Sequence, residues 1–247
     1  MKINEIYLGD CLELTPKQVE DKSIDMIFCD LPYGTTKCKW DSLIDLPKLW
    51  SEYERIIKDN GVILLFAQSP FDKVLGASNL KLLKYEWIWE KTSATGHLNA
   101  KKMPMKAHEN LLVFYKKPPT YNPQKTSGHE RKVSKAEHKT NCKESEVYNK
   151  GQKLTTYDST ERYPRSVLTF ASDKQKSKLH PTQKPLSLIE YMIKTYTNEG
   201  DLILDNTCGS GTTGLGAKNL KRDYIMMEQD PEYYEIACKR ILTQYCR

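Results

Sequence analysis

Hydrophobic and polar positions follow two different periods along the chain, which predicts strands and helices in turn. The largely apolar run at residues 24–29 predicts a buried strand, and the continuous apolar run at 62–67 is typical of a strand in the interior of a sheet. Apolar residues at three- and four-residue spacing, as in residues 46–58, predict amphipathic helices. In full, the pattern predicts strands at 3–8, 24–29, 62–67, 85–89, 111–115, 202–205 and 224–227, and helices at 12–19, 46–58, 185–196, 212–220 and 232–245.

Turn residues suggest where several of these elements begin and end. Asn60-Gly61 is expected to stop the helix at 46–58, and Ser69 to cap another helix with Pro70 in its first turn. Residues 91–110 are expected to form a polar loop between two strands. Because strands and helices alternate, we predict an α/β fold with a mostly parallel sheet and helices on both faces. The first strand would join the last block to complete one sheet.

Residues 118–178 interrupt this regular pattern. They open with Pro118-Pro119, lack sustained periodicity and are rich in Lys, Ser, Thr, Asn and Gln, and order is expected to return near residues 163–168. Residues 101–180 hold 18 Lys/Arg against 8 Asp/Glu, a net of +10, whereas the rest of the chain is near −4. Interleaved tyrosines in this basic stretch favour nucleic acid as the partner. A solvated lysine-rich loop is the alternative.

Length and composition narrow the class of protein. The 247 residues suit one α/β domain with an embedded insertion. There is no apolar run of membrane-spanning length and no signal-peptide pattern at the start, so a cytoplasmic protein without membrane contact is expected. The seven cysteines contain no C-x-x-C pair, so neither a metal site nor a disulfide framework is predicted.

The first stretch with candidate chemistry is Asp30-Leu31-Pro32-Tyr33-Gly34, directly after the apolar run at 24–29. Ligands of open α/β sheets bind beyond the carboxyl ends of the strands. A carboxylate, a main-chain carbonyl and an aromatic ring at that place suit a flat ring that bears an amine. The alternative is an ordinary turn after a strand.

The second stretch runs from Asp205 through a glycine-rich loop into a predicted helix. Glycines let the backbone approach a ligand closely, and the amino end of the following helix attracts anionic groups. Glu228 ends the strand at 224–227, where dinucleotide folds place an acid for ribose hydroxyls. A plain tight turn and a strand-end charge are the alternatives.

Together these stretches resemble the DNA amino-methyltransferases that use S-adenosylmethionine. That family has a D/N/S-P-P-Y/F catalytic motif, matched by Asp30–Tyr33, and an F-x-G-x-G cofactor motif, matched by Thr207–Gly211. Further matches are Leu8-Gly9-Asp10-Cys11 and His180-Pro-Thr-Gln-Lys184-Pro185. Because the catalytic motif comes first, the chain is similar to the circularly permuted beta group. The resemblance covers nearly the whole chain apart from residues 118–178.

The resemblance implies a Rossmann-like catalytic and cofactor domain at 1–117 and 179–247, with a target-recognition insertion at 118–178. It implies double-stranded DNA as substrate, with a homodimer and a restriction-endonuclease counterpart as partners. The loop at 91–110 would help to hold the target base. The implied catalytic residues are Asp30, Leu31, Pro32 and Tyr33, and the implied cofactor-binding residues are Asp10, Cys11, Asp30, Lys184, Asp205, Asn206, Thr207, Gly209, Ser210, Gly211, Thr212, Thr213 and Glu228.

Individual roles follow from the same resemblance. Asp30 and the Leu31 carbonyl would accept the two amine N–H groups of a flipped base, on which Tyr33 would stack. Glu228 would accept the ribose hydroxyls, and Lys184, with Thr182, would lie near the methionine carboxylate. Asp10 would lie near the cofactor's adenine or simply end its strand in a turn, and Asp205 would orient its loop or bind the cofactor's amino group. Cys11, Cys29 and Cys208 are also natural small apolar fillers.

Two departures and several alternatives qualify the match. Leu31 stands where the family has its first proline, and Asn206 stands where many relatives have proline. Asp30 rather than Ser favours adenine N6 over cytosine N4 as the target. The alternatives are a cytosine-N4 or RNA amino-methyltransferase, a glutamine methyltransferase, and a DNA-binding relative that has lost its cofactor. The basic insertion argues against the protein-modifying enzyme, and the intact motifs argue against the non-catalytic relative.

Overall fold

The computed structural model describes residues 2–34, 43–134, 156–172 and 183–242. It contains two compact units, Met1–Asn122 with Ser166–Arg247, and Pro123–Arg165. The larger unit is built on an eight-stranded sheet in the order β1-β10-β9-β2-β3-β5-β4-β8. Its strands are β1 (Glu5–Leu8), β2 (Ile24–Cys29), β3 (Ile57–Ala67), β4 (Leu83–Thr95), β5 (Lys106–Phe114), β8 (Val167–Phe170), β9 (Leu202–Asp205) and β10 (Asp223–Glu228).

Most of this sheet is parallel. All four pairings from β1 through β10, β9 and β2 to β3 are parallel, β5 runs antiparallel to both β3 and β4, and β8 is parallel to β4. The first strand therefore pairs with the last one, which places both ends of the chain's regular structure in one sheet. The prediction of an α/β, Rossmann-like fold is confirmed.

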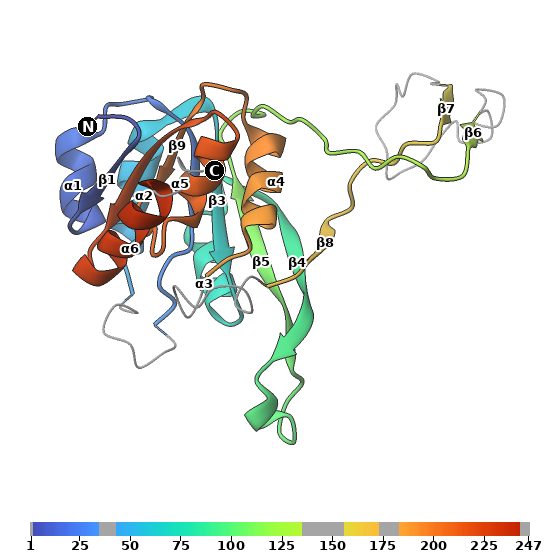
Figure 1. The fold of residues 1–247 in the computed structure, drawn as a ribbon, viewed down its shortest axis with the longest axis horizontal. Helices are drawn as coiled ribbons and strands as arrows, with labels where there is room; N and C mark the ends of the chain where they lie inside the picture. Colours follow the sequence, from blue (N-terminus) through green and yellow to red (C-terminus); the bar gives the residue numbers. More distant parts are fainter. Residues whose placement is uncertain (1, 35–42, 135–155, 173–182, 243–247) are drawn as a thin grey trace. The chain divides into compact units, whose positions relative to one another are not determined.

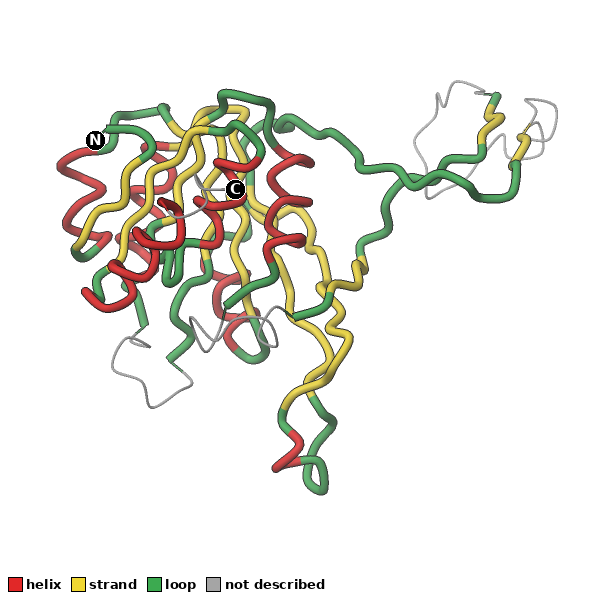
Figure 2. Tube along the Cα trace, in the orientation of Figure 1, coloured by secondary structure: helices red, strands yellow, loops and turns green. Residues whose placement is uncertain are grey.

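Helices cover both faces of the sheet (Figures 1 and 2). The helices α1 (Cys11–Gln18), α2 (Leu46–Ile56) and α3 (Phe71–Ser78) form one layer, and α4 (Leu186–Tyr196), α5 (Thr212–Asn219) and α6 (Pro231–Leu242) form the other. The strands explain this arrangement, because successive side chains point to opposite faces. Ile63 and Leu65 pack into the core between the sheet and the layer of α1, α2 and α3. Val62 and Leu64 pack into the core between the sheet and the layer of α4, α5 and α6.

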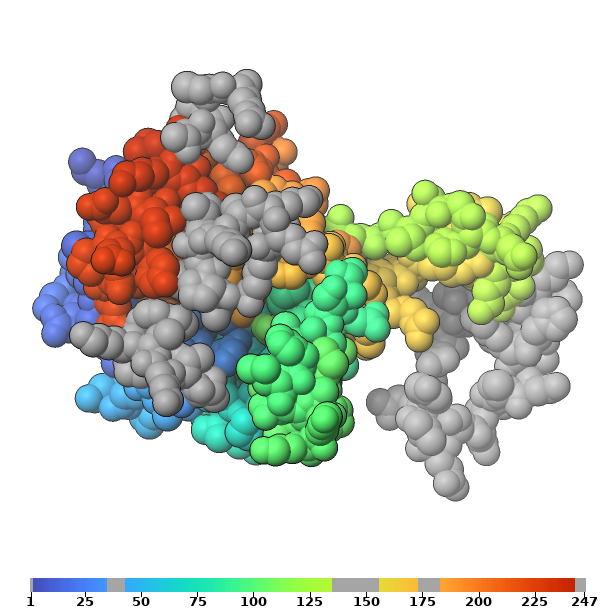
Figure 3. Space-filling model, turned by 60° about the horizontal axis from the view of Figure 1, so that its bottom comes forward, coloured from blue at the N-terminus to red at the C-terminus, as the bar shows by residue number. Residues whose placement is uncertain are grey.

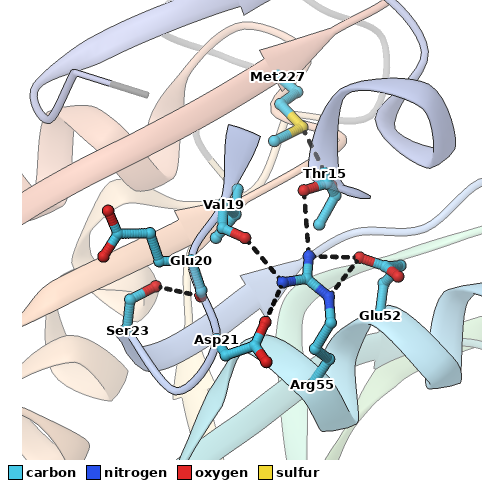
Figure 4. Close-up of polar contacts among 8 residues, drawn as sticks. All are labelled: Thr15, Val19, Glu20, Asp21, Ser23, Glu52, Arg55 and Met227. Carbon is cyan, nitrogen blue, oxygen red and sulfur yellow. Dashed lines mark hydrogen bonds and ion pairs between the residues drawn. The ribbon is translucent and has the colours of Figure 1, made fainter. Parts of the chain in front are cut away.

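Arg55 fastens α2 to the segment that follows α1 (Figure 4). Its guanidinium donates to the carbonyl oxygens of Thr15 and Val19 and pairs with the carboxylates of Asp21 and Glu52. Guanidinium geometry suits this role, because its five donors form a rigid fork that can serve several oxygens at once. The contacts hold α1 and α2 together within their layer.

Three predicted boundaries are wrong. Asn60-Gly61 does not stop a helix: α2 ends at Ile56, and β3 starts at Ile57 and runs through the glycine. Gly61 is needed for close approach, because a Cβ there would lie 2.9 Å from the Asp25 carbonyl oxygen. The helix expected at Ser69-Pro70 begins at Phe71, and its first turn lacks the expected side-chain cap.

The third correction concerns the polar loop predicted at 91–110. Instead, β4 continues to Thr95 and β5 begins at Lys106, with only a short 3₁₀ turn, η1 (His97–Asn99), near the tip. Cross-strand hydrogen bonding satisfies the backbone of a two-stranded ribbon whatever its side chains are. The polar sequence therefore forms paired strands here. The prediction relied on the spacing of apolar residues, which does not indicate strands in a polar segment.

The smaller unit, Pro123–Arg165, contains the antiparallel pair β6 (Lys132–Ser134) and β7 (Tyr157–Ser159) and a bridge between Thr126 and Arg162. The ion pair of Arg131 with Asp158 fastens the strand pair. The insertion expected from the sequence was wider, 118–178; within it, β8 joins the large sheet and residues 173–178 lie outside the described part. Its role in target recognition stays a prediction.

Candidate active site

The two motifs meet because their strands are neighbours in the sheet. β2 and β9 pair in parallel, so Asp30 and Asp205 lie at the same edge, where both strands end. The hydroxyl of Thr207 donates to the main-chain oxygen of Asp30 at 3.2 Å, which joins the two loops directly. Behind them, the buried amide oxygen of Asn206 accepts hydrogen bonds from Tyr53 at 2.9 Å and from the Cys29 thiol at 3.2 Å. Asn206 therefore fastens the loop to the core.

A cavity of about 440 Å³ lies at this edge. It is lined by every predicted site residue except one: Asp10, Cys11, Asp30, Leu31, Pro32, Tyr33, Lys184, Asp205, Asn206, Thr207, Gly209, Ser210, Thr212, Thr213 and Glu228. The exception is Gly211, which begins α5 and packs against Ala237 of α6. Thr182 lies outside the described residues.

Both oxygens of the Asp30 carboxylate already have partners. The hydroxyl of Tyr33 donates to Oδ1 at 2.7 Å, and the ammonium of Lys184 pairs with Oδ2 at 2.7 Å. Burial raises the pKa of Asp30, and the positive charge of Lys184 opposes that shift. The ring of Tyr33 stacks on Phe71, with centroids 5.2 Å apart. Asp30 and Tyr33 are thus held as a pair at one end of the cavity.

Lys184 belongs to a chain of four alternating charges. Its ammonium also pairs with Glu109 at 3.0 Å, and Glu109 pairs with Lys91 at 2.6 Å. Burial would raise the pKa of Glu109, but the two lysines outweigh it and lower this pKa to about 2. The pKa of Lys184 is raised, because two carboxylates outweigh the cost of its burial. Glu109 is therefore ionised at neutral pH, and Lys184 is shared between two carboxylates.

Glu109 was not predicted to belong to the site. It lies within the polar segment that was expected to be a loop, so no strand was predicted there to carry its side chain into the cavity. The signal that was available is a charged residue placed directly before the buried strand residues Asn110 to Phe114. Lys184 was expected near the methionine carboxylate of the cofactor, and this stays a prediction; its ammonium contacts Asp30 and Glu109.

Glu228 and Asp10 lie on the other side of the cavity. Glu228 accepts the main-chain N–H groups of Gly209 at 2.8 Å and Asp230 at 2.9 Å, and burial raises its pKa. Asp10 accepts the N–H of Leu12 at 2.7 Å and so caps α1. Each carboxylate oxygen can accept more than one hydrogen bond, so both groups retain acceptor capacity toward the cavity.

Asp205 lies beneath the glycine loop. Its carboxylate accepts the Thr207 N–H at 3.2 Å and interacts with the hydroxyl of Thr213, yet burial raises its pKa to about 7. From outside the loop, the Arg240 guanidinium donates to Ser210 and Thr212. Arg240 was not singled out by the sequence, because α6 is far along the chain from the motif that it braces.

The S-adenosylmethionine expected from the resemblance fits this lining. Acidic side chains suit its ribose hydroxyls and its ammonium group. The buried amide oxygen of Gln183 lines the same cavity and has no hydrogen-bond partner among the described residues. Such an acceptor needs a donor to offset its burial, and a cationic ligand provides one. Gln183 belongs to one of the matching motifs, but no role was predicted for it.

Other chemistry has less support within the described residues. They contain no cluster of three or more His, Cys, Asp or Glu side chains that could hold a metal ion. The buried thiols of Cys11, Cys29 and Cys208 have raised pKa values because burial disfavours the thiolate. They are therefore poorly suited to act as nucleophiles. None of the described helices is long and apolar enough to cross a membrane.

Comparison with known proteins agrees with this geometry. A family model described as DNA methylase, covering N6 and N4 enzymes, matches residues 24–239. The Type II methyltransferases M2.MboI and M1.MboII, both of Moraxella bovis, are 29% and 28% identical; the alignments cover 95% and 94% of this chain, and 86% and 94% of the relatives.

Solved structures give the same result. The crystal structure of an M1.HpyAVI–SAM complex is 25% identical with a TM-score of 0.64, over 96% of this chain and 98% of that one. The cytosine-N4-specific PvuII DNA methyltransferase, at 18% identity and a TM-score of 0.66, covers 96% of this chain and shares the fold. The predicted cofactor is confirmed. The chain belongs to the DNA methylase family and is a site-specific, S-adenosylmethionine-dependent DNA methyltransferase of the N6/N4 type.

Proposed function

We propose that the target is the N6 amine of adenine in double-stranded DNA, and that Asp30 is the residue that activates it. The observation that carries this proposal is the position of Asp30, whose residue lines the cavity, whose carboxylate is held by Tyr33 and Lys184, and whose main-chain oxygen is joined to the glycine loop through Thr207. Aspartate rather than serine at position 30 supports adenine over cytosine. Transfer to cytosine N4 is the second candidate, because the family includes both kinds of enzyme.

The chain's own residues supply three contributions. Asp30 and the main-chain oxygen of Leu31 would accept the two N–H groups of the amine, which favours a pyramidal nitrogen with an available lone pair. The same carboxylate would stabilise the positive charge that develops on that nitrogen, as a preorganised group in a water-poor site. Tyr33 would stack on a base that has left the duplex. No covalent bond between the protein and the base is required.

The network around Asp30 has a defined part in this scheme. Burial raises the pKa of Asp30 and so favours its protonated form, which is the weaker hydrogen-bond acceptor. The Lys184 ammonium opposes this shift and favours the ionised carboxylate. The hydroxyl of Tyr33 fixes the orientation of the carboxylate through Oδ1. The amine of the target would therefore meet an ionised carboxylate that is already oriented.

The cofactor would be held by residues on the other side of the cavity. We assign Glu228 to the ribose hydroxyls, Asp205 and Gln183 to the ammonium group, and the main chain of Gly209 and Ser210 to the methionine portion. Asp10 lies beside Glu228's strand and would face the adenine. When bound, S-adenosylmethionine supplies an electrophilic methyl group on a sulfonium centre.

The remaining parts of the chain complete the proposal. We infer that the unit Pro123–Arg165 reads the target sequence, since it holds 10 Lys/Arg against 6 Asp/Glu and lies within the basic central segment of the chain. The motif order is that of the permuted beta group, in which dimers are common. The Type II names of the relatives support a restriction endonuclease with the same target site as the counterpart.

The test is methyl transfer from labelled S-adenosylmethionine to unmethylated duplex DNA, followed by separation of the nucleosides. Label in N6-methyladenine is expected. Label in N4-methylcytosine would overturn the choice of base, and transfer to RNA alone would overturn the choice of substrate. Asp30→Asn is expected to lower the rate of methyl transfer at saturating cofactor by about 10²- to 10³-fold, and calorimetry measures its cofactor affinity separately.

A further inference from the structure

The strands β4 and β5 extend well past the rest of the sheet as a two-stranded ribbon. The last pair between β3 and β5 joins Ala67 to Asn110, and Asn110 faces Ile88 on β4. β8 accompanies β4 as far as the Lys91–Phe170 pair, and beyond it β4 continues with β5 alone to Thr95, which pairs with Lys106 after a register shift. Along β5 from Asn110 to Lys106, at about 3.3 Å per residue, the ribbon of paired strands reaches roughly 13 Å beyond the end of β3. Figure 1 shows it leaving the body, with η1 near its tip.

This ribbon leaves from the edge of the sheet at which the cavity opens. β4 is antiparallel to β5, which is antiparallel to β3, so β4 points in the same direction as β3 and β2. Residues along β4 in the ribbon, Lys91, Ser93 and Thr95, line the cavity itself. In Figure 3, where this side of the molecule comes forward, the ribbon is the green projection. A duplex that delivers a base to the cavity must therefore pass beside the ribbon.

The surface of the ribbon combines apolar and basic side chains. Leu98 is 89% exposed, Met103 53% and Met105 41%, although large apolar groups are normally covered. Residues 92–107 contain Lys101, Lys102 and Lys106 and no Asp or Glu. The ammonium of Lys106 donates to the side-chain oxygen of Gln68 at 3.0 Å, which ties the ribbon to the body. Within residues 92–107, the apolar side chains of the tip are therefore accompanied by positive charges and by no negative one.

We propose that this tip is a DNA-binding wedge. Lys101 and Lys102 bind phosphates beside the target nucleotide, and Leu98 packs against the base stack as the target base leaves it. The inference rests on the proposed function, because a base must enter the cavity. A major groove about 12 Å wide admits a two-stranded ribbon. Leucine and methionine are side chains that proteins insert between base steps, where they cover the surface exposed by unstacking.

DNA explains these features better than a second copy of the chain does. The tip carries only positive charge, and two copies of it would repel each other at a shared interface. Phosphates neutralise the lysines, and the bases offer an apolar surface to Leu98. A protein interface at the tip is the competing occupant, and it makes a different prediction for the oligomeric state.

The wedge is tested with the variant Leu98→Ala, and Leu80→Ala is the control. Leu80 is also an exposed leucine, at 68%, but it lies just before the start of β4, at the end away from the tip. DNA methylated by the wild-type protein is sequenced to identify the target site, and two duplexes are made, with the target base paired or mismatched. Leu98→Ala is expected to lower kcat/KM on the paired duplex by roughly tenfold, with most of the loss restored on the mismatch, because a mismatched base is extruded more easily. Leu80→Ala is expected to match the wild type on both duplexes.

The phosphate contacts are tested with the double variant Lys101→Ala/Lys102→Ala against Lys81→Ala/Lys84→Ala. The tip variant should weaken DNA binding, and the slope of log affinity against log salt should be less steep by about 1.8. The control should keep the wild-type slope. Cofactor binding is measured for each variant by calorimetry, and its retention reports that the larger unit is folded.

The outcomes separate the two proposals. Absence of DNA methylation by the wild type would contradict the proposed function. Two results together would overturn the wedge alone. Leu98→Ala would methylate the paired duplex as fast as the wild type does, and Lys101→Ala/Lys102→Ala would bind DNA with the wild-type affinity and salt dependence. A change in sedimentation of the tip variants with unchanged DNA affinity would assign the tip to a second copy of the chain, and that also overturns the wedge.

Discussion

Four side chains form the charged centre of the cavity: Lys91, Glu109, Lys184 and Asp30 alternate in sign and are joined by contacts of 2.6, 3.0 and 2.7 Å. Removing one member of a buried ion pair leaves its partner uncompensated in a medium that solvates charge poorly. Loss of the Glu109 charge has the largest expected effect, because this carboxylate separates two ammonium groups. Its contribution is therefore electrostatic, and it acts on Asp30 through Lys184.

Glu109→Gln should destabilise the protein by roughly 3 kcal/mol at pH 7. The pKa of Glu109 is lowered from 4.5 to about 2 in the folded state, so its stabilising contribution is complete above pH 4.5 and is lost as the pH falls towards 2. The difference in the free energy of unfolding between wild type and variant, measured with urea, should therefore become smaller as the pH falls from 4.5 towards 2. Glu13→Gln, at an exposed site of α1, is the control and should show no such interval.

Asp205 behaves in the opposite sense. Burial raises its pKa from 3.8 to about 7, so the folded state binds more protons than the unfolded state between these values, and stability falls as the pH rises through them. If its carboxylate binds the cofactor's ammonium group, the affinity for S-adenosylmethionine should increase with pH up to about 7 and then level off. Calorimetry at several pH values measures this. Asp205→Asn should bind weakly at every pH, and a pH-dependent affinity in that variant would assign the titration to another group.

Among the elements, the junction between β9 and α5 determines the shape of the cofactor side. Gly211 has a φ of +75°, and a Cβ there would lie 3.0 Å from the Cβ of Ala237 on α6. The loop before it is braced by Arg240, which also belongs to α6. The cavity-facing residues of the loop therefore depend on packing that takes place on its far side.

Gly211→Ala should cost about 1–2 kcal/mol from the positive φ alone, and more from the contact with Ala237. Gly200→Ala is a matched control, since Gly200 has a φ of +83° and a Cβ added there would have no atom within 4 Å. Both variants should lose stability in thermal unfolding, but only Gly211→Ala should also bind S-adenosylmethionine more weakly. Equal cofactor affinity in the two variants would contradict the role of this packing.

In the molecule as a whole, the described lining of the cavity comes only from the larger unit, Met1–Asn122 with Ser166–Arg247. The smaller unit has its own strand pair and its own ion pairs. This division of the chain predicts that cofactor binding and sequence recognition can be separated, because the residues that would serve each of them belong to different units.

Replacing residues 123–165 by a flexible Gly-Ser linker should leave cofactor affinity close to that of the intact chain. Site-specific methylation should fall by about a thousandfold or more, in line with the usual difference between specific and non-specific DNA binding. Calorimetry and sequencing of methylated DNA measure the two quantities. Retention of the full site preference by this variant would assign recognition to the larger unit.

Features that depend on near neighbours in the chain could be predicted from the residues alone. The interior strands 24–29 and 202–205 were found with their observed bounds, because short, largely apolar segments bounded by polar residues are typical of strands inside a sheet. The two motifs were found because each is a short stretch of fixed spacing at the end of such a strand. The mostly parallel sheet followed from the alternation of strands and helices, whereas the pairing of the first strand with the last block was expected from the permuted order of the motifs.

The contacts between side chains that are far apart in the sequence depend on the tertiary structure of the sheet. Lys91, Glu109 and Lys184 come from separate stretches of β4, β5 and the segment before α4, and their charges match only in the folded chain. The ribbon of β4 and β5 was missed for the same reason, since hydrogen bonds between two strands can hold a polar sequence extended. Local periodicity reports burial, whereas ion pairing and strand length depend on partners that are remote in the chain.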